Sequence, residues 1–290
     1  MTHLPFQAFA WAASILFAVE TIQAKFVSKH KIENPWLFNI VWLLFLLVLN
    51  TVICLWAGTR VPHVWGNVIW VGLFFALGMS LFTLSNYKLD VSVLTPLSNF
   101  HTIFVVILGV LFLGENLTVV QVWLIAIMII AGIVVTLDEN ISIRSFFSKG
   151  VAIALASMFS FALMAMFFKK ASMEVDFWTL NLWYFFIGAI LITIFTWPFF
   201  KKDVRILDKN QIGNVLFLAL AGVAGNLASN KAYASNISIS GAIIYIPLSM
   251  LVVMALSPFF PKLFEHHTWK VYAIRIVSTA VLVYAGIRLI

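Results

Sequence analysis

Charged residues and cysteine are both scarce in this chain, and each scarcity excludes a class of protein. Only 10% of the 290 residues are Asp, Glu, Lys or Arg, whereas 63% are hydrophobic. Because so few charged side chains cannot keep so apolar a chain in water, it is predicted to be an integral membrane protein. The single cysteine, Cys54, excludes an intramolecular disulfide and a cysteine metal cluster.

Motifs for catalysis are missing as well. The chain contains no Gly-x-x-x-x-Gly-Lys-Ser/Thr nucleotide loop and no His-Glu-x-x-His zinc helix. The pair His266-His267 has no further ligand candidate beyond Glu265, so neither a metal site nor a cofactor is expected. We therefore do not expect an enzyme. A membrane-embedded enzyme acting on a lipid-linked substrate and a non-transporting scaffold or receptor remain the alternatives to a transporter.

What the chain does contain is ten apolar segments of a length that can cross a bilayer, which takes about 20 helical residues. The apolar runs are continuous rather than alternating, which excludes a β-barrel. The fold is therefore predicted to be all-α with ten transmembrane helices. The predicted crossings are residues 6–28, 35–57, 66–87, 91–113, 117–137, 150–170, 177–199, 212–232, 238–260 and 269–288.

The first five segments are echoed by the last five. Trp36-Leu-Phe-Asn39 returns as Trp178-Thr-Leu-Asn181 at the same place in the second half. We expect one repeat over residues 1–137, a linker over 138–149 and a second repeat over 150–290. Since five crossings are an odd number, the second repeat must be inverted in the membrane, and both termini must lie on one side.

Several short motifs occur in the same order as in a known family. They are Tyr87–Pro96, Leu113-Gly-Glu-Asn-Leu-Thr118, Ala131-Gly132 and Tyr245-Ile-Pro247, while 258–265 departs from the usual Leu-Gly-Glu pattern. With these motifs the chain resembles EamA-type proteins of the drug/metabolite transporter superfamily. The resemblance implies a secondary transporter that exports or exchanges a small organic metabolite, such as an amino acid, a sugar or a drug-like compound.

The resemblance also implies a multi-pass protein of the cell membrane with both termini in the cytoplasm. That orientation would place twelve connector Lys and Arg residues outside and five inside, which opposes the positive-inside rule. The net charge of +7 lies in short connectors beside the lipid, so lipid headgroups rather than nucleic acid are the expected partners. Because two repeats complete the predicted site, we expect a monomer.

Glu20 is the first candidate for a functional residue, because a charge at the centre of a membrane helix costs about 2.5 to 3.5 kcal/mol. Gln23 follows it on the same helical face. In the functional interpretation, protons or a cationic substrate compete for Glu20 and couple transport to a proton gradient. In the structural interpretation, a Ser, Asn or Lys of a neighbouring helix holds the carboxylate.

Two polar stripes at helical spacing predict the walls of a shared cavity, since polar groups in lipid must face protein or water. Two prolines within the same crossings are predicted to kink them or to expose backbone carbonyls. The stripes are Ser92, Thr95, Asn99 and Thr102 in the fourth crossing and Ser238, Gly241, Tyr245 and Ser249 in the ninth, and the prolines are Pro96 and Pro247.

Three residues near the ends of the third and eighth crossings are candidates for gating or binding: Asn86, Asn230 and Lys231. Helix capping and interhelical hydrogen bonds are the alternative roles for the two asparagines, and reaching a lipid headgroup is the alternative role for the lysine. His101 projects opposite the stripe of its own helix, so we expect it to pack against another helix.

Overall fold

The computed structural model describes residues 4–30, 34–89, 91–134, 149–203, 209–246, 248, 252 and 269–289. These residues form ten α-helices, which begin and end close to the predicted crossings except at the end of α9. The helices are α1 Phe6–His30, α2 Pro35–Trp56, α3 Gly66–Lys88, α4 Val91–Leu113, α5 Val119–Val134, α6 Lys149–Ala171, α7 Phe177–Phe200, α8 Lys209–Tyr233, α9 Ile237–Ile244 and α11 Trp269–Arg288.

Side-chain caps start four of these helices, one of them α5, where the Thr118 hydroxyl accepts from the Gln121 backbone N–H. The side chain of Asn34 accepts hydrogen bonds from the backbone N–H groups of Trp36 and Leu37 at the start of α2. Asp176 and Asn236 cap α7 and α9 in the same way. Each cap satisfies backbone donors that have no partner within their own helix. The local sequence therefore determines where these helices begin.

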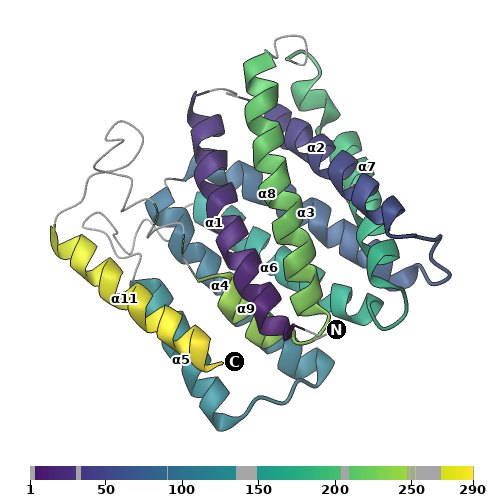
Figure 1. The fold of residues 1–290 in the computed structure, drawn as a ribbon. Coiled ribbons are helices and arrows are strands. Elements are labelled where there is room, and N and C mark those ends of the chain that lie inside the picture. Colours follow the sequence, from purple (N-terminus) through teal and green to yellow (C-terminus); the bar gives the residue numbers. More distant parts are fainter. Residues whose placement is uncertain are drawn as a thin grey trace.

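The helices of one half pack mainly against those of the other half. The most extensive contacts are those of α3 with α6 and of α1 with α8, followed by those of α4 with α6 and α3 with α7. If α1 to α5 correspond to α6, α7, α8, α9 and α11 in that order, α3–α6 and α8–α1 are the same contact made twice. The bundle is therefore an interlocked pair of halves rather than two separate packages (Figure 1).

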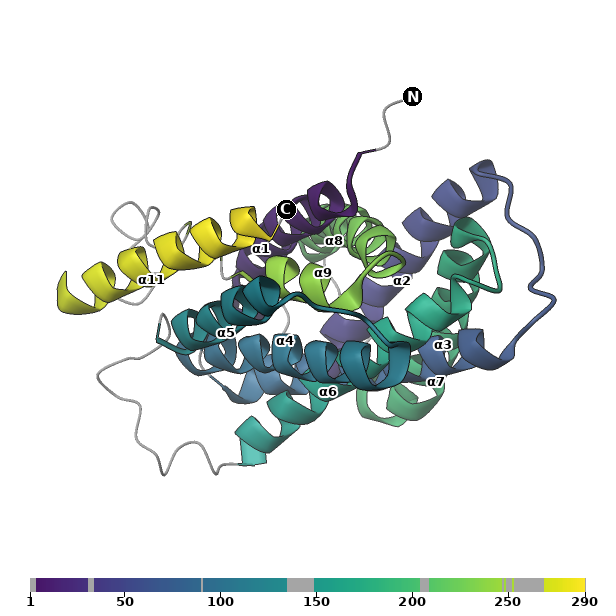
Figure 2. The ribbon, with the colours of Figure 1, turned by 90° about the horizontal axis from the view of Figure 1, so that it is seen from below.

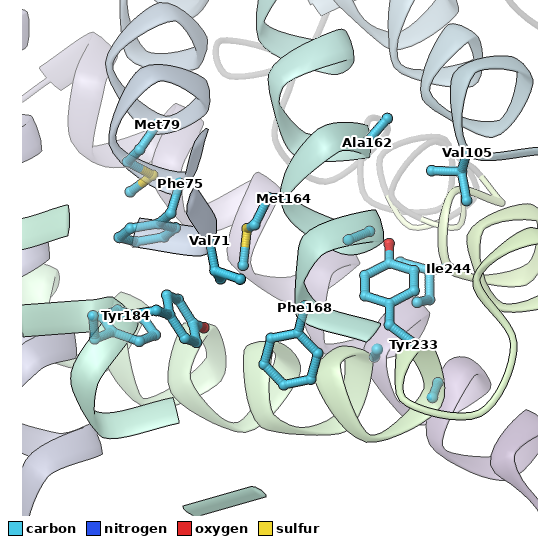
Figure 3. Packing of buried hydrophobic residues seen from close by; sticks show 14 of the residues in the cluster. Val71, Phe75, Met79, Val105, Ala162, Met164, Phe168, Tyr184, Tyr233 and Ile244 are labelled. Carbon is cyan, nitrogen blue, oxygen red and sulfur yellow. The ribbon is translucent and has the colours of Figure 1, made fainter. Parts of the chain in front are cut away.

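The outer helices also follow this pairing. Figures 1 and 2 show α5 and α11 together at one edge of the molecule, with α2 and α7 toward the opposite edge. Both pairs consist of corresponding helices of the two halves. Between these edges lies the apolar core, in which Tyr184 packs edge-on against Phe75 and Phe168 (Figure 3).

Several helices have the length and composition of membrane crossings. They are α2, α3, α6, α7 and the Gly213–Tyr233 part of α8, and shorter apolar helices cover Leu97–Leu113, Val119–Ala131 and Ile276–Arg288. Many of their large apolar side chains are exposed, including Trp56, Leu111 and Phe195. An apolar exterior of this kind suits contact with lipid rather than with water.

Helix α9 is shorter than the predicted crossing 238–260. It ends at Ile244, and Tyr245 is its C-cap, with its backbone N–H bonded to the carbonyls of Gly241 and Ile243. The residue before a proline is disfavoured in helical conformation, and proline has no N–H, so Pro247 explains why regular helix stops here. Most of the remainder, including Pro247 and Ser249, lies outside the described residues.

Candidate functional site

Glu20 is buried within α1, with 9% of its surface exposed. It faces α8, because a Cβ atom added to Gly222 would lie 2.4 Å from Glu20 Oε1 and 2.9 Å from Cδ2 of Leu46. The glycine therefore provides the space that the carboxyl group occupies. Among the residues that the structure describes, none donates a hydrogen bond to Glu20 or forms an ion pair with it. Gln23, one turn further, likewise has a buried Oε1 without a partner in that part of the chain.

Three aromatic rings from other helices form a row that begins with Tyr245 beside Glu20. Tyr245, at the end of α9, is close enough to interact electrostatically with its carboxyl group. The imidazole of His101 in α4 stacks on the Tyr245 ring, with centroids 4.0 Å apart and an angle of 24° between the planes. Tyr233, at the end of α8, lies on another side of His101, with centroids 6.5 Å apart. Residues of both halves thus meet around one buried acid.

The polar stripes of α4 and α9 face each other. Thr102 donates a hydrogen bond to the backbone carbonyl of Gly241 at 3.4 Å, and a Cβ added to Gly241 would lie 3.1 Å from Val105. Asn99 is also buried. At this level the two stripes pack directly against each other. The side chains of Ser92, Thr95 and Pro96 are outside the described part of the structure, as are Pro247 and Ser249.

A second buried carboxylate, Glu115, lies just after α4 and is surrounded by donors. Its Oε1 accepts from Lys169 Nζ at 3.1 Å and from the Ile237 backbone N–H at 2.7 Å. Its Oε2 accepts from the N–H and the hydroxyl of Ser238 at 3.0 and 2.6 Å. Lys169 also donates to the carbonyl of Ser235. Glu115 thus caps α9 and joins it to the end of α6.

These contacts also show how the halves are oriented. The α3–α4 and α4–α5 junctions lie at opposite ends of α4, and Glu115 belongs to the second of them. The residue touches the α8–α9 junction, which corresponds in the second half to the α3–α4 junction. Corresponding junctions therefore lie at opposite ends of the bundle, as inverted repeats require.

The three candidates for gating or binding near helix ends make different contacts. Asn86 donates to the carbonyl of Phe82 within its own helix at 3.1 Å. The side chain of Asn230 is buried and donates to Asn181 Oδ1 and to the Tyr184 hydroxyl, each at 2.8 Å. Lys231 is exposed, with its ammonium group 5.1 Å from the centre of the Phe177 ring. The structure does not bring these three residues together.

Two residues have larger roles in the geometry than sequence reasoning assigned to them. His101 does pack against other helices, but its partner Tyr245 also lies beside Glu20. Glu115 was part of the Leu-Gly-Glu motif, with no role assigned. A signal for both was available, since an acid or an imidazole in an apolar chain requires a partner. The identity of the partners was not readable, because they lie more than fifty residues away in the chain.

No group of three or more potential metal ligands gathers among the described residues, a range that omits His266 and His267.

Comparison with known proteins gives a family and a fold. The model described as the EamA-like transporter family matches residues 6–137 and again residues 148–288. A crystal structure described only as that of a protein is similar over 98% of each chain, with a TM-score of 0.69 and 15% sequence identity. At that identity the similarity concerns the fold alone. No curated protein sequence matches the chain.

Proposed function

The chain belongs to the EamA-like transporter family, and we propose that it is a secondary active transporter that exports or exchanges a small organic metabolite, with Glu20 as the coupling residue. The family makes it a membrane transporter. The substrate class, the direction and the coupling are our proposal. The observation that carries it is the buried carboxyl group of Glu20, which has no donor among the described residues.

A buried carboxylate without a partner is costly, so Glu20 has to be neutralised. A proton can do this, and so can the ammonium group of a substrate. Because both bind the same oxygen atoms, binding of one favours release of the other. Competition of this kind couples a proton gradient to substrate movement without any further machinery.

The surroundings of Glu20 support this role. Tyr245 and His101 provide aromatic faces, against which a cationic group can pack. Tyr245 is also where α9 stops being a regular helix, and broken helices are common at transporter binding sites. Because Glu20 lies in α1 and Tyr245 at the end of α9, movement of one half against the other would change the distance between them.

Proton flux in proteoliposomes tests the coupling. We expect that a pool of metabolites containing amines, added to vesicles with a pH gradient, drives proton movement for the wild type. Glu20→Gln should abolish that movement and weaken substrate binding, because the amide neither titrates nor pairs with an ammonium group. Glu174→Gln is the matched control, because Glu174 is exposed and contacts only Asn67 in the described structure. Wild-type proton flux in Glu20→Gln would rule out this coupling.

We also propose a location in the cell membrane with both termini in the cytoplasm, which places Lys202 outside. Lys202 is exposed just after α7, whereas Cys54, the only native cysteine, is buried. In intact cells, a membrane-impermeant thiol reagent should therefore label Lys202→Cys and not the wild type. If Lys202→Cys is protected from the reagent, the opposite orientation, with both termini outside the cell, is the correct one. A monomer is the expected state, and the mass of the purified protein in detergent tests it.

A further inference from the structure

The repeated Trp-x-x-Asn motif places an asparagine near the start of α2 and another near the start of α7. In the second half this asparagine, Asn181, is fully used. Its Nδ2 donates to the Phe177 carbonyl at 2.8 Å, and its Oδ1 accepts from Asn230 at 2.8 Å. Asn230 also donates to the Tyr184 hydroxyl, which completes a three-residue cluster between α7 and α8.

The corresponding residues of the first half are not joined in this way. Asn39 corresponds to Asn181, yet both polar atoms of its side chain are buried without a partner among the described residues. Asn86 corresponds to Asn230, but it bonds to its own helix instead. Asn39 itself is 0% exposed, so water does not reach its amide. One half thus joins its two asparagines, although Asn230 Oδ1 has no partner among the described residues, and the other half does not join them.

Two more buried polar atoms without partners accompany Asn39. They are Nε1 of Trp42, one turn along α2, and Oγ1 of Thr83 in α3. The rings of Phe38 and Tyr87 are 6.4 Å apart, and α2 and α3 are consecutive and antiparallel, so four residues further Trp42 is level with Thr83. Trp42 is 5% exposed and Thr83 1%.

Buried polar atoms without partners are rare in folded proteins, and three such residues at neighbouring levels of two adjacent helices require an explanation. A bound ligand that forms hydrogen bonds with all three residues is one such explanation. Asn39 offers a donor and an acceptor side by side, Trp42 a donor, and Thr83 either. The complementary group is neutral and carries its own adjacent donor and acceptor, as a carboxamide does.

This site and Glu20 lie along one face of α2. Leu46, whose side chain shares the space beside Gly222 with Glu20, follows Asn39 by two turns and Trp42 by about one. Seven residues of helix span about 10 Å. A small molecule with an ammonium group at one end and an amide-like group at the other can therefore reach from Glu20 to Asn39.

We propose that Asn39, Trp42 and Thr83 form a binding subsite for the carboxamide-like group of a small amine substrate. The subsite deepens the proposed transport function and rests on it. Binding requires α2 and α3 to move apart, which is a movement within the first half. In the second half Asn181, Tyr184 and Asn230 occupy one another and serve packing.

The same substitution at the two corresponding asparagines tests the difference between the halves without any ligand. Asn181→Leu should lower the unfolding temperature of the purified protein by several degrees, because it breaks one buried and one partly buried hydrogen bond. Asn39→Leu should leave that temperature unchanged or raise it, because leucine has nearly the same shape and no polar atom to leave unpaired. An equal loss in both variants would overturn the inference.

Three related amines test the ligand class: 6-aminohexanamide, 6-aminohexanoate and hexylamine. All three carry the amine for Glu20, and only the first carries an amide. We expect the wild type to bind 6-aminohexanamide about tenfold more tightly than hexylamine, the effect of roughly one net hydrogen bond. Asn39→Leu should lose this preference, and Trp42→Phe, which removes one N–H and keeps a ring, should reduce it.

Equal binding of 6-aminohexanamide and hexylamine by the wild type, or an undiminished preference in Asn39→Leu, would overturn the subsite, and so would absence of binding by all three amines. Failure of the transport proposal has a different signature. In that case the amide preference persists in calorimetry, and proteoliposomes show no proton or substrate movement.

Discussion

Glu115 and Glu20 are two carboxylates with almost the same burial and opposite surroundings. Their exposed fractions are 8% and 9%. Glu115 accepts four hydrogen bonds, one of them from the ammonium group of Lys169. Glu20 has no donor among the described residues. Burial alone therefore does not distinguish a structural acid from one that is available for exchange, whereas the set of partners does.

The same contrast applies to the two amide clusters. Asn181 and Asn230 hold each other, and Asn39 has unpaired polar atoms in the described structure. Glu20 and Asn39 both belong to the first half. The duplicated fold thus joins its two asparagines in one copy and leaves them apart in the other. Asymmetry of this kind gives two similar halves different roles.

The largest effect on stability is expected for Glu115→Gln. The change removes one partner of a buried ion pair and weakens the cap of α9, which costs about 3 to 5 kcal/mol. Urea unfolding in detergent micelles should show the loss. Adding Lys169→Met to this variant should recover part of the loss, because no uncompensated charge then remains. A single variant as stable as the wild type would contradict the structural role of Glu115.

Adding a methyl group beside each carboxylate should have unequal effects. In Gly109→Ala the new Cβ would lie 2.4 Å from the Ser238 hydroxyl and 2.6 Å from Glu115 Oε2, both held by hydrogen bonds, so we expect a loss of about 1 to 3 kcal/mol. In Gly222→Ala the nearest atom is Oε1 of Glu20, which can turn away. Thermal unfolding of the pair measures the difference, and the reverse order would show that Glu20 is the fixed group.

An exposed carboxylate gives an intermediate reference. Asp176 caps α7 by accepting from the Thr179 N–H at 3.0 Å, and Asp176→Ala should cost about 0.5 to 2 kcal/mol near neutral pH. Partial burial raises its pKa, but hydrogen bonds from Thr179 and Trp178 and the charge of Arg60 outweigh this and hold the pKa below its ordinary value.

A carboxylate whose pKa is lowered by folding stabilises the folded state above its unfolded pKa, and this stabilisation is lost as the pH falls through the folded value. The difference in unfolding temperature between Asp176→Ala and the wild type should therefore shrink in acid. A difference that does not change with pH would mean that the cap acts without its charge.

The smallest effect on stability is expected for Glu20→Gln. No described interaction is lost, and a neutral amide replaces a group that is costly to bury in its charged form. We expect a change below about 1 kcal/mol, or a gain, in the same urea assay used for Glu115→Gln. A loss of stability as large as that of Glu115→Gln would mean that Glu20 has a structural partner. Both acids would then have a structural role.

Helix positions were predictable because each crossing is a long apolar run with local end signals. The predicted crossing 91–113 agrees with α4, and 177–199 differs from α7 by one residue. The crossing 238–260 was predicted as one continuous helix, but α9 ends at Ile244 before Pro247, and residues 248 and 252 beyond it are helical again. Hydropathy measures transfer into lipid and is insensitive to the loss of one backbone donor.

The candidate site was predictable only in part. Spacing alone placed Thr102 and Gly241 on polar faces of corresponding helices, and the structure joins them. The duplication was readable at Asn39 and Asn181, but the difference between them was not. Hydrogen bonding depends on the position of a second helix, and sequence periodicity carries no information about the distance between helices.

The sequence by itself therefore determined an all-helical membrane chain with two copies of one five-helix pattern. Hydropathy and capping depend only on residues within one segment, and the inversion of the second copy depends only on the odd number of crossings in each copy. Only the tertiary structure decided which polar groups have partners. Glu115, Lys169 and Ser238 are far apart in the chain, and Glu20 meets Tyr245 only after the two halves interlock. The energetic character of a buried polar group depends on neighbours that packing supplies, so it is a property of the folded molecule.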